Sequence, residues 1–391
     1  LLEDVDRIEV ISGPGGTVWG ANAVNGVINI ITKNASETRG LYATVGAGSF
    51  LRRNAALRYG GNIGEKLSYR VYGLYMDRDH TFLANGDDHT DAWNLGQSGF
   101  NVEWNATDKD MVVAQGNAYM GTHDNVPSES TVDGQNILGR WSHVINERSS
   151  FALQAYYDRT WRRDIPSTIS DQMETYDVDF DHSFALAPRH NLVWGAGYRF
   201  IHNQTLNSTD LVVLVPPTRN MDLISAFVQD EIAMAGDRLR LILGTKFQHN
   251  IFSGFEIQPG MRLAWLERNY TLWGAVSRAV RAPSRIDSDY FLPTFPVPPN
   301  TPNVAGGPNF TSEKVVAWEL GYRFQPSANT FLSIAAFYND YNDLYSVEAL
   351  PGTVTYQIQN GTEGSSRGVE FSGRVQVTSQ WKLRGGYSYF Y

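Results

Sequence analysis

The fold of this chain is decided by one stretch near its start, Asp4–Lys33, which reads DVDRIEVISGPGGTVWGANAVNGVINIITK. β-branched residues are concentrated at positions 8–11 and 27–31, and such runs predict two short strands. The glycine-rich turn at positions 13–16 can continue neither of them. The stretch therefore predicts a strand, a tight turn, one short helical turn and a second strand.

The same stretch has a partial likeness to a phosphate-binding loop. Gly15 and Gly20 have the spacing of the first two glycines of that motif. Ala21 and Asn22, however, occupy the positions where a lysine and a hydroxyl residue contact phosphate and magnesium. This mismatch excludes a phosphate-binding loop, and a βαβ piece of a soluble protein is the general alternative that remains.

Composition restricts the class of protein further. The chain has 391 residues, of which 42% are apolar and 13% aromatic, and it has no cysteine. No apolar run approaches the roughly 18 residues that a membrane helix needs. Abundant glycine and aromatics in short alternating runs are typical of a transmembrane β-barrel. The formal charge of −9 argues against a nucleic-acid partner.

From Gly40 onward the chain falls into segments of about ten residues in which apolar and polar side chains alternate, as in strands that face lipid on one side and a lumen on the other. The alternation is clearest in residues 239–247, 316–324, 369–376 and 381–389. Short turns alternate with longer polar loops, which predicts periplasmic turns and extracellular loops and a total of about 17 strands. The predicted long loops are residues 77–97, 121–135, 162–172, 202–220 and 281–311.

The opening stretch closely resembles the end of the plug domain of TonB-dependent outer-membrane receptors. In that family a D-x-x-R-I-E-V-x-x-G-P run is followed by a glycine and then by G-V-I-N-I-I-T-K. The corresponding plug-motif positions here are Glu9, Gly13, Pro14, Gly20, Asn25 and Gly26. Later stretches resemble recurrent strand signatures of the same receptors, namely residues 227–231, 277–283, 319–323, 336–341 and 367–371.

The resemblance implies an all-β fold, a transmembrane antiparallel β-barrel with a lumenal plug. Residues 1–36 would be the C-terminal end of the plug domain, and residues 37–391 an incomplete outer-membrane barrel. Members of the family have about 22 strands, so about five strands would lie outside this chain. Open edges leave backbone groups unpaired in hydrocarbon at several kcal/mol each. We therefore expect a chain that is truncated at both ends and does not close alone.

The alternation places Glu319 and Glu370 on the lumen face, where a shielded carboxylate needs a partner. The resemblance implies a plug–barrel lock in which a plug arginine, here Arg7, bridges the two glutamates through its planar guanidinium group. The alternative is that each glutamate pairs with a neighbouring barrel cation, namely Arg323, Arg367 or Arg374.

The loop 281–311 contains seven prolines and several aromatic side chains. Proline limits the freedom that a loop loses when it closes over a ligand, and aromatics supply stacking surface. The expected ligand-binding residues are Arg281, Tyr290, Phe291, Phe295 and Phe310, and packing over the barrel mouth is the alternative. Haem receptors of this family have a histidine in this segment, and its absence between Ser284 and Phe310 disfavours a haem ligand.

Two other motifs could indicate a catalytic residue or a metal site, but neither is supported by its surroundings in the sequence. A G-x-S-x-G pattern at residues 364–368 would indicate a hydrolase nucleophile only between a strand and a helix. An alternating strand follows it, so no catalytic residue is predicted and the chain is not expected to be an enzyme. The aspartates and histidines of residues 77–91 could bind a divalent cation, but a solvated acidic loop is favoured, and neither a metal site nor a cofactor is predicted.

The implied function is active uptake of a scarce ligand, such as an iron–siderophore or another metal chelate, by a receptor in the outer membrane of a Gram-negative bacterium. The implied partners are the TonB energy-coupling complex of the inner membrane, the small-molecule ligand and outer-membrane lipid, with no nucleic acid and a monomeric receptor. A passive outer-membrane porin or adhesin-type binding barrel is the alternative, although neither would need a plug. Cobalamin and oligosaccharide stay open as ligands.

Overall fold

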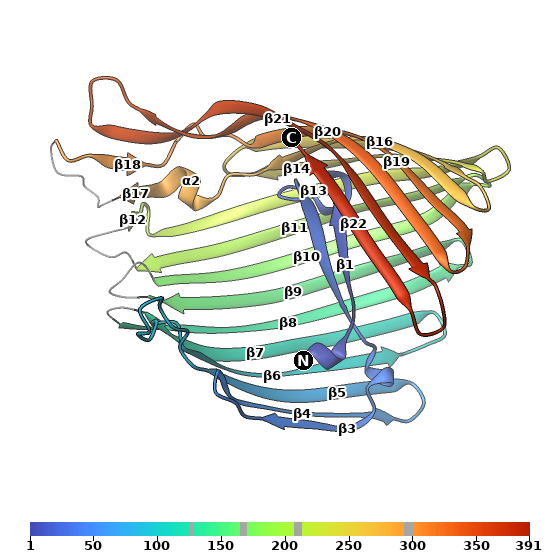
Figure 1. Cartoon of the computed structure of the whole chain (residues 1–391), viewed down its shortest axis with the longest axis horizontal. Helices are drawn as coiled ribbons and strands as arrows, with labels where there is room; N and C mark the ends of the chain where they lie inside the picture. Colours follow the sequence, from blue (N-terminus) through green and yellow to red (C-terminus); the bar gives the residue numbers. More distant parts are fainter. Residues whose placement is uncertain (126–127, 165–169, 207–212, 293–299) are drawn as a thin grey trace.

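The computed structural model describes residues 1–125, 128–164, 170–206, 213–292 and 300–391. These residues form two sheets, a small one of β1 and β2 and one large curved sheet (Figure 1). Within the described ranges no helix is long and apolar enough to cross a membrane. The large sheet is the predicted antiparallel β-barrel, and the small sheet is separate from it.

Seventeen long strands of the described chain build the barrel wall, which confirms the predicted number. Consecutive members of this set are joined by antiparallel ladders. Their bounds are β3 (Gly40–Gly46), β4 (Leu51–Ile63), β5 (Leu67–Arg78), β6 (Trp93–Asn105), β7 (Asp110–Asn125), β8 (Ser128–Asn146), β9 (Ser149–Arg163), β10 (Ser170–Ala187), β11 (His190–Leu206), β13 (Thr218–Met234), β14 (Leu239–Asn250), β15 (Gly254–Leu266), β16 (Tyr270–Arg281), β19 (Glu313–Ser327), β20 (Thr330–Ala349), β21 (Thr355–Gln376) and β22 (Lys382–Phe390).

The connections differ between the two ends of the barrel. At one end all eight are tight turns, as predicted, at residues 64–66, 106–109, 147–148, 188–189, 235–238, 267–269, 328–329 and 377–381. At the other end the connection between β16 and β19 contains α2 (Arg285–Asp289), β17 (Tyr290–Leu292) and β18 (Asn303–Ala305). β17 pairs with β18 and with β12 (Val213–Leu214), and β18 pairs in parallel with β21.

One predicted loop is wrong. Residues 121–135 are not a long loop, because the ladder between β7 and β8 continues through the pairs Gly121↔Val132 and Thr122↔Thr131. Polar side chains led to the loop prediction, but backbone pairing does not require apolar side chains once the strands leave the lipid layer. Parts of three other predicted loops, residues 165–169, 207–212 and 293–299, lie outside the described residues.

The predicted alternation is confirmed by burial. On the outer face of β19, Trp318 and Leu320 are exposed, and Phe371 on β21 is exposed in the same way. Gln248 on β14 and Gln258 on β15 face the interior and are almost fully buried. The outward side chains are therefore apolar and the inward ones polar, as a membrane barrel requires.

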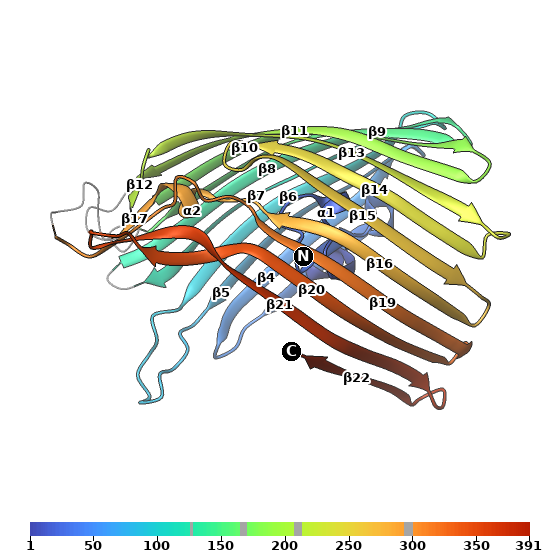
Figure 2. The same ribbon diagram turned by 90° about the horizontal axis from the view of Figure 1, so that it is seen from above.

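Residues 1–36, called here the lumenal segment, cross the interior of the curved sheet (Figure 2). They form η1 (Leu2–Asp4), β1 (Val5–Ser12), α1 (Gly16–Trp19) and β2 (Gly26–Thr32), and they end within η2 (Ala35–Glu37). β1 and β2 pair with each other and with no strand of the wall in the described chain. The predicted order of strand, turn, helical turn and strand is thus confirmed.

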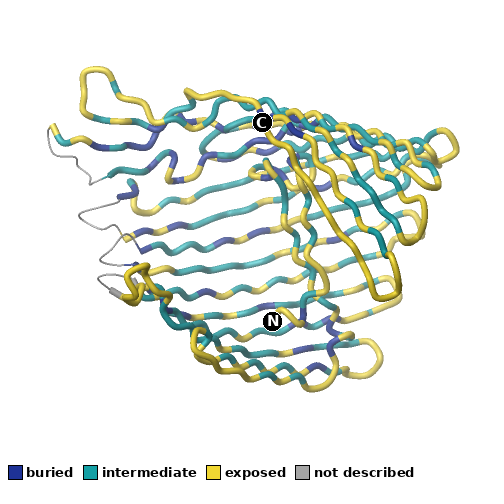
Figure 3. Tube along the Cα trace, in the orientation of Figure 1, coloured by how far each residue is buried: buried dark blue, intermediate teal, exposed yellow. Residues whose placement is uncertain are grey.

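The two ends of the large sheet are the strands β3 and β22. The strand order places them next to each other, yet no ladder of the described residues joins them. All nine residues of β22 are exposed, and the strand is the continuous exposed tube near the C-terminus in Figure 3. Both strands thus present backbone groups that no neighbouring strand of the described chain pairs.

Candidate functional site

The base of the lumenal segment is held to β4, β5 and β6 by buried polar groups. The Asp4 carboxylate forms an ion pair with Arg58, and its other oxygen lies 3.8 Å from Arg70 Nε. Arg70 also donates a hydrogen bond to the Lys33 carbonyl oxygen at 2.7 Å. Asp4 and Arg70 are each about 5% exposed at the side chain. A buried carboxylate is thus matched by two guanidinium groups, as burial of charge requires.

A second contact lies at the end of the segment. The backbone N–H of Ala35, a fully buried residue, donates to Glu103 Oε1 on β6 at 2.9 Å. Glu103 is also buried, and this hydrogen bond satisfies a charged oxygen inside the wall. Both ends of the lumenal segment are therefore anchored on the same group of three strands.

The tip of the lumenal segment is held on the opposite side, by side-chain amides. Gln248 Oε1 accepts hydrogen bonds from the Ala21 N–H and from Gln258 Nε2, both at 2.6 Å. The wall must approach closely here, because a Cβ atom at Gly20 would lie 2.8 Å from Gln248 Nε2. Gly20 also has a φ of +83°, a conformation in which glycine avoids the steric cost of a side chain.

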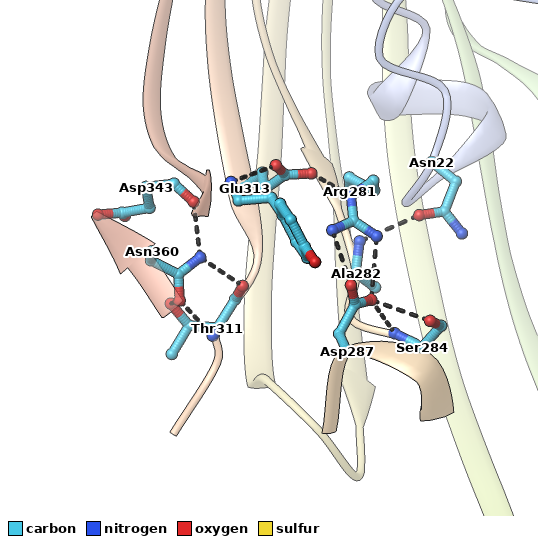
Figure 4. A network of polar contacts seen from close by, with 10 residues as sticks. Asn22, Arg281, Ala282, Ser284, Asp287, Thr311, Glu313, Asp343 and Asn360 are labelled. Atoms are coloured by element: carbon cyan, nitrogen blue, oxygen red, sulfur yellow. Dashed lines mark hydrogen bonds and ion pairs between the residues drawn. The ribbon is translucent and has the colours of Figure 1, made fainter. Parts of the chain in front are cut away.

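Asn22 joins the tip to the end of β16. Its N–H donates to the Val280 carbonyl oxygen at 2.7 Å, and its Oδ1 accepts from the Ala282 N–H at 3.0 Å. These two contacts bracket Arg281, whose guanidinium group pairs with Glu313 and, at 3.0 Å, with Asp287 of α2 (Figure 4). The tip of the lumenal segment therefore touches the strand that carries the α2 connection.

The α2 connection is held by charge. Burial alone would raise the pKa of Asp287, but hydrogen bonds from Arg281 and Ser284 outweigh it and hold the pKa below its usual value. Arg285 of the same helix donates to Asp289 at 2.9 Å and to Asn203 of β11 at 2.6 Å. The short helix is therefore fixed to two separate parts of the barrel wall.

A cavity of about 1330 Å³ lies beside the tip. Trp19 of α1 lines it and is 47% exposed, and strands β8 to β14 together with α2 supply the wall. A cavity of this size can hold a ligand larger than those of ordinary small-molecule sites, which occupy about 300–1,000 Å³. The tip of the lumenal segment and the mouth connections thus meet around one space.

The predicted lock around Arg7 is not formed in this structure. Arg7 is exposed and pairs with Asp6 and Glu9, each at 2.7 Å. Of the two predicted carboxylates, Glu319 lies directly against the glycine-rich turn. Its Oε1 is so near that a Cβ atom added to Gly13 would lie only 2.7 Å from it. Glu370 is within electrostatic range of Glu319, as is Arg262. The described residues contain no ion pair between Arg7 and either glutamate.

The alternative partners of the two glutamates are not formed either. No ion pair of the described chain joins Glu319 or Glu370 to Arg323, Arg367 or Arg374. The guanidinium groups of these arginines lie over the rings of Trp273, Tyr391 and Phe331. The ion pairs of the described residues that do join the lumenal segment to the wall have the charges exchanged. In them the carboxylate of Asp4 belongs to the segment, and the arginines, Arg58 and Arg70, belong to the wall.

The plug-motif residues shape the turn itself. The Gly13 N–H donates to the Asn25 carbonyl oxygen at 3.1 Å, and Gly26 pairs with Ser12 to end the ladder between β1 and β2. Pro14 is buried beside them. Glu9 accepts hydrogen bonds from Arg7 at 2.7 Å and from Asn29 at 3.1 Å, which ties the two strands together. These residues fix the shape of the turn and so hold the tip against the wall.

The four predicted ligand-binding residues that the structure describes divide into two pairs. Arg281 and Phe310 are engaged in packing, since the guanidinium group lies 5.6 Å from the Phe310 ring and Phe310 is 3% exposed. Tyr290 and Phe291 lie in β17, where they pair with β12. Phe295 lies outside the described residues. A ligand-binding role for this set stays a prediction.

Two other sequence motifs have a structural place. Residues 364–368 lie inside β21, so the G-x-S-x-G pattern has no strand-to-helix turn. In the acidic connection between β5 and β6, Asp91 accepts hydrogen bonds from the Thr81 hydroxyl and N–H, which lower the pKa of Asp91. Within the described ranges, no three His, Asp or Glu side chains are grouped as metal ligands.

The fold and the site define a class, a large antiparallel membrane barrel whose lumen is crossed by an anchored segment. The model of the TonB dependent receptor-like β-barrel matches residues 25–391. The chain therefore belongs to the family of TonB-dependent receptor-like β-barrels.

Individual relatives agree with this family. The chain is 24% identical to an iron-regulated outer membrane virulence protein of Vibrio cholerae over 99% of its own length and 62% of that protein. It is 24% identical to the ferric enterobactin receptor PirA of Pseudomonas aeruginosa, over 87% of this chain and 56% of that one. The solved structure of the P. aeruginosa siderophore receptor PirA superposes with a TM-score of 0.80 at 20% identity, over all of this chain and 73% of that one. The chain thus spans about three fifths of the curated relatives.

Proposed function

We propose that this chain is the barrel and the C-terminal end of the plug, residues 1–36, of a TonB-dependent outer-membrane receptor that takes up a scarce metal chelate, such as an iron–siderophore. The observation that carries the proposal is the attachment of the lumenal segment. It crosses the lumen as a separate sheet, and in the described chain its hydrogen bonds and ion pairs to the wall are individual polar contacts, at Asp4, Val18, Ala21, Asn22, Lys33 and Ala35 among others.

This attachment suits a plug that is moved during transport. A segment whose strands joined the ladders of the wall would be part of the barrel, whereas among the described residues β1 and β2 pair as strands only with each other. Breaking a small number of polar contacts costs far less than extracting a strand from a sheet. The cavity beside the tip then provides the space in which a ligand waits before the plug moves.

The partners follow from the same arrangement. The energy for moving the plug would come from the TonB complex of the inner membrane, and the apolar outer face of the wall would contact outer-membrane lipid in a Gram-negative cell. The receptor would act as a monomer on a small-molecule ligand. One relative is named as a ferric enterobactin receptor, which supports a metal chelate as the ligand class.

The test is growth of iron-starved cells that lack their own siderophore receptors and express the complete gene. Ferric chelates of several charge types are supplied singly as the only iron source. We expect at least one to support growth in cells with TonB and none in cells without it. Uptake that persists without TonB would instead support the passive porin, and binding of every chelate without any uptake would support an adhesin-type barrel.

A further inference from the structure

The ladder between β15 and β16 stops early on the mouth side of the barrel, the end that carries the α2 connection. Its last pair at that end is Gly260 with Ser277, although both strands continue beyond it. The next residue of β15 is Pro259, which has no N–H group and cannot donate a ladder hydrogen bond. In the described chain, residues 254–259 of β15 and 278–281 of β16 are therefore not joined by a ladder, and this break in the wall is called here the seam.

Side chains bridge part of the seam. Arg278 of β16 donates hydrogen bonds to the carbonyl oxygen of Ile257 and, at 3.2 Å, to the carboxylate of Glu256, both on β15. In the other direction, Gln258 Oε1 accepts from the Val280 N–H at 3.4 Å. Gln258 and Val280 are fully buried, so a backbone group left unpaired here costs about as much as a lost hydrogen bond. The carbonyl oxygen of Val280 still needs a donor.

The tip of the lumenal segment supplies that donor. The Asn22 N–H donates to the Val280 carbonyl oxygen at 2.7 Å, and Asn22 Oδ1 accepts from the Ala282 N–H at 3.0 Å (Figure 4). A neighbouring parallel strand would pair the same two backbone groups, which flank Arg281, through the N–H and C=O of one residue. Asn22 does so with its side-chain oxygen in place of its carbonyl, at a φ of +76° that asparagine adopts more readily than most residues. The tip thus takes the place of the missing strand beside β16.

The tip packs closely enough to act as that neighbour. α1 starts at Gly16, a buried residue that lies on the seam. A Cβ atom at this position would lie 2.5 Å from Gln258 Oε1 on β15 and 3.1 Å from Ala279 Cβ on β16, closer than ordinary van der Waals contact. Glycine therefore lets the backbone of the tip reach both sides of the seam.

The end of β16 connects this contact to the mouth. On its other edge the strand pairs with β19 as far as Arg281 and Glu313. Arg281 then holds α2 through Asp287, and α2 begins at Arg285. The stretch that leads into the α2 connection therefore lies between a strand of the wall on one side and the tip of the lumenal segment on the other.

We infer that the tip of the lumenal segment is a latch for the α2 connection. While the tip is seated, Asn22 completes the open edge of β16 and holds the stretch that leads into α2. When the tip leaves, the Val280 carbonyl and the Ala282 N–H lose their partners, and the α2 connection is released. Such coupling is reciprocal, so displacement of α2 weakens the hold on the tip to the same extent. The coupling follows from contacts within this chain, whereas its use in transport, where withdrawal of the plug and opening of the mouth become one event, rests on the proposed function.

The test is backbone hydrogen exchange of the purified complete receptor, followed by mass spectrometry. Asn22→Gly removes the acceptor of the Ala282 N–H and tolerates the positive φ. Exchange in residues 280–291 should become at least about fivefold faster, the ratio expected for one neutral hydrogen bond. Asn22→Asp is the matched control, because it keeps an acceptor oxygen at the same place and tolerates the same φ. Its exchange should stay close to that of the wild type.

The reciprocal experiment starts from the mouth. Asp287→Asn weakens the contact between Arg281 and α2, and it should speed exchange at residues 20–24 of the tip. This measurement is informative even if Asn22→Gly fails to fold. Faster exchange confined to the lumenal segment in Asn22→Gly, unchanged exchange of the tip in Asp287→Asn, or equal acceleration by Asn22→Gly and Asn22→Asp would overturn the inference. None of these measurements uses uptake, so the proposed function is decided separately by the TonB dependence of growth.

Discussion

The amide oxygen of Gln248 accepts a hydrogen bond from the backbone N–H of Ala21 at 2.6 Å, across 227 positions of sequence. The same oxygen accepts from Gln258, a fully buried residue of the neighbouring strand. One barrel side chain therefore connects the wall to the tip of the lumenal segment.

Gln248→Ala should loosen the tip. The change leaves the Ala21 N–H and the Gln258 amide without their acceptor, at a cost of about 1–3 kcal/mol for buried donors. In the complete receptor, backbone hydrogen exchange at residues 17–23 should become faster. Gln229→Ala, which alters another cavity-lining residue of the wall, is the control and should leave that exchange unchanged.

Asp4→Asn should destabilise the base of the segment far more than Asp6→Asn. The first change leaves two buried guanidinium groups without a counter-charge, which costs about 3–5 kcal/mol when a buried pair is broken. The second removes an exposed partner of Arg7. Thermal unfolding and protease sensitivity of the complete receptor would measure the difference, and equal effects of the two variants would contradict the assigned anchor.

Arg7→Ala tests the lock that the family resemblance implied. Because Arg7 is exposed and pairs only with Asp6 and Glu9 among the described residues, its removal should leave unfolding and plug exchange unchanged. If Arg7→Ala lowered the stability of the receptor as much as Asp4→Asn, the result would support the predicted contact of Arg7 with Glu319 and Glu370.

The α2 connection should respond to acid but not to mild alkali. The pKa of Asp287 is lowered in the folded state, so the ionised carboxylate contributes stability that is fully present above the unfolded-state pKa of about 3.9. That contribution is lost as the pH falls through the lower folded-state value. Proteolysis of residues 285–292 by an acid-tolerant protease should therefore begin only below about pH 4. In Asp287→Asn the cleavage should no longer depend on pH.

The orientation of the barrel can be checked on intact cells. Cysteines introduced at Asn85 and Asn300, both exposed in the longer connections, should react with a membrane-impermeant maleimide. A cysteine at Asp237, in a tight turn at the opposite end, should react only after the outer membrane is permeabilised. The reverse pattern would place the long connections in the periplasm.

The elements of the fold were predictable because their signals are local. Alternation along residues 316–324 and the turn residues between strands depend only on neighbouring positions, and the structure confirms both. The contacts of the lumenal segment were not predictable in the same way. Which side chain of the segment meets which strand depends on how the segment is rotated inside the barrel, and alternation contains no information about that rotation.

The contacts between the lumenal segment and the wall show why local signals were not enough. Lumen-facing carboxylates suggested an arginine of the segment as partner, but Asp4 with Arg58 and Arg70 satisfies the same electrostatic need with the charges exchanged. Gln248 and Asn22 gave no signal at all, because an amide in an alternating strand or a glycine-rich turn looks like any other polar residue. Only the arrangement in space distinguishes them.

The separate anchoring of base and tip has a mechanical consequence. A force transmitted along the backbone from the N-terminal side would load the Asp4 contact first, then the pairing of β1 with β2, and the amide contacts of Ala21 and Asn22 last. Contacts loaded in series fail one after another, so the peak force is set by the strongest single anchor and not by the sum of all of them. A modest, sustained pull would then open the lumen in steps while the wall stays intact.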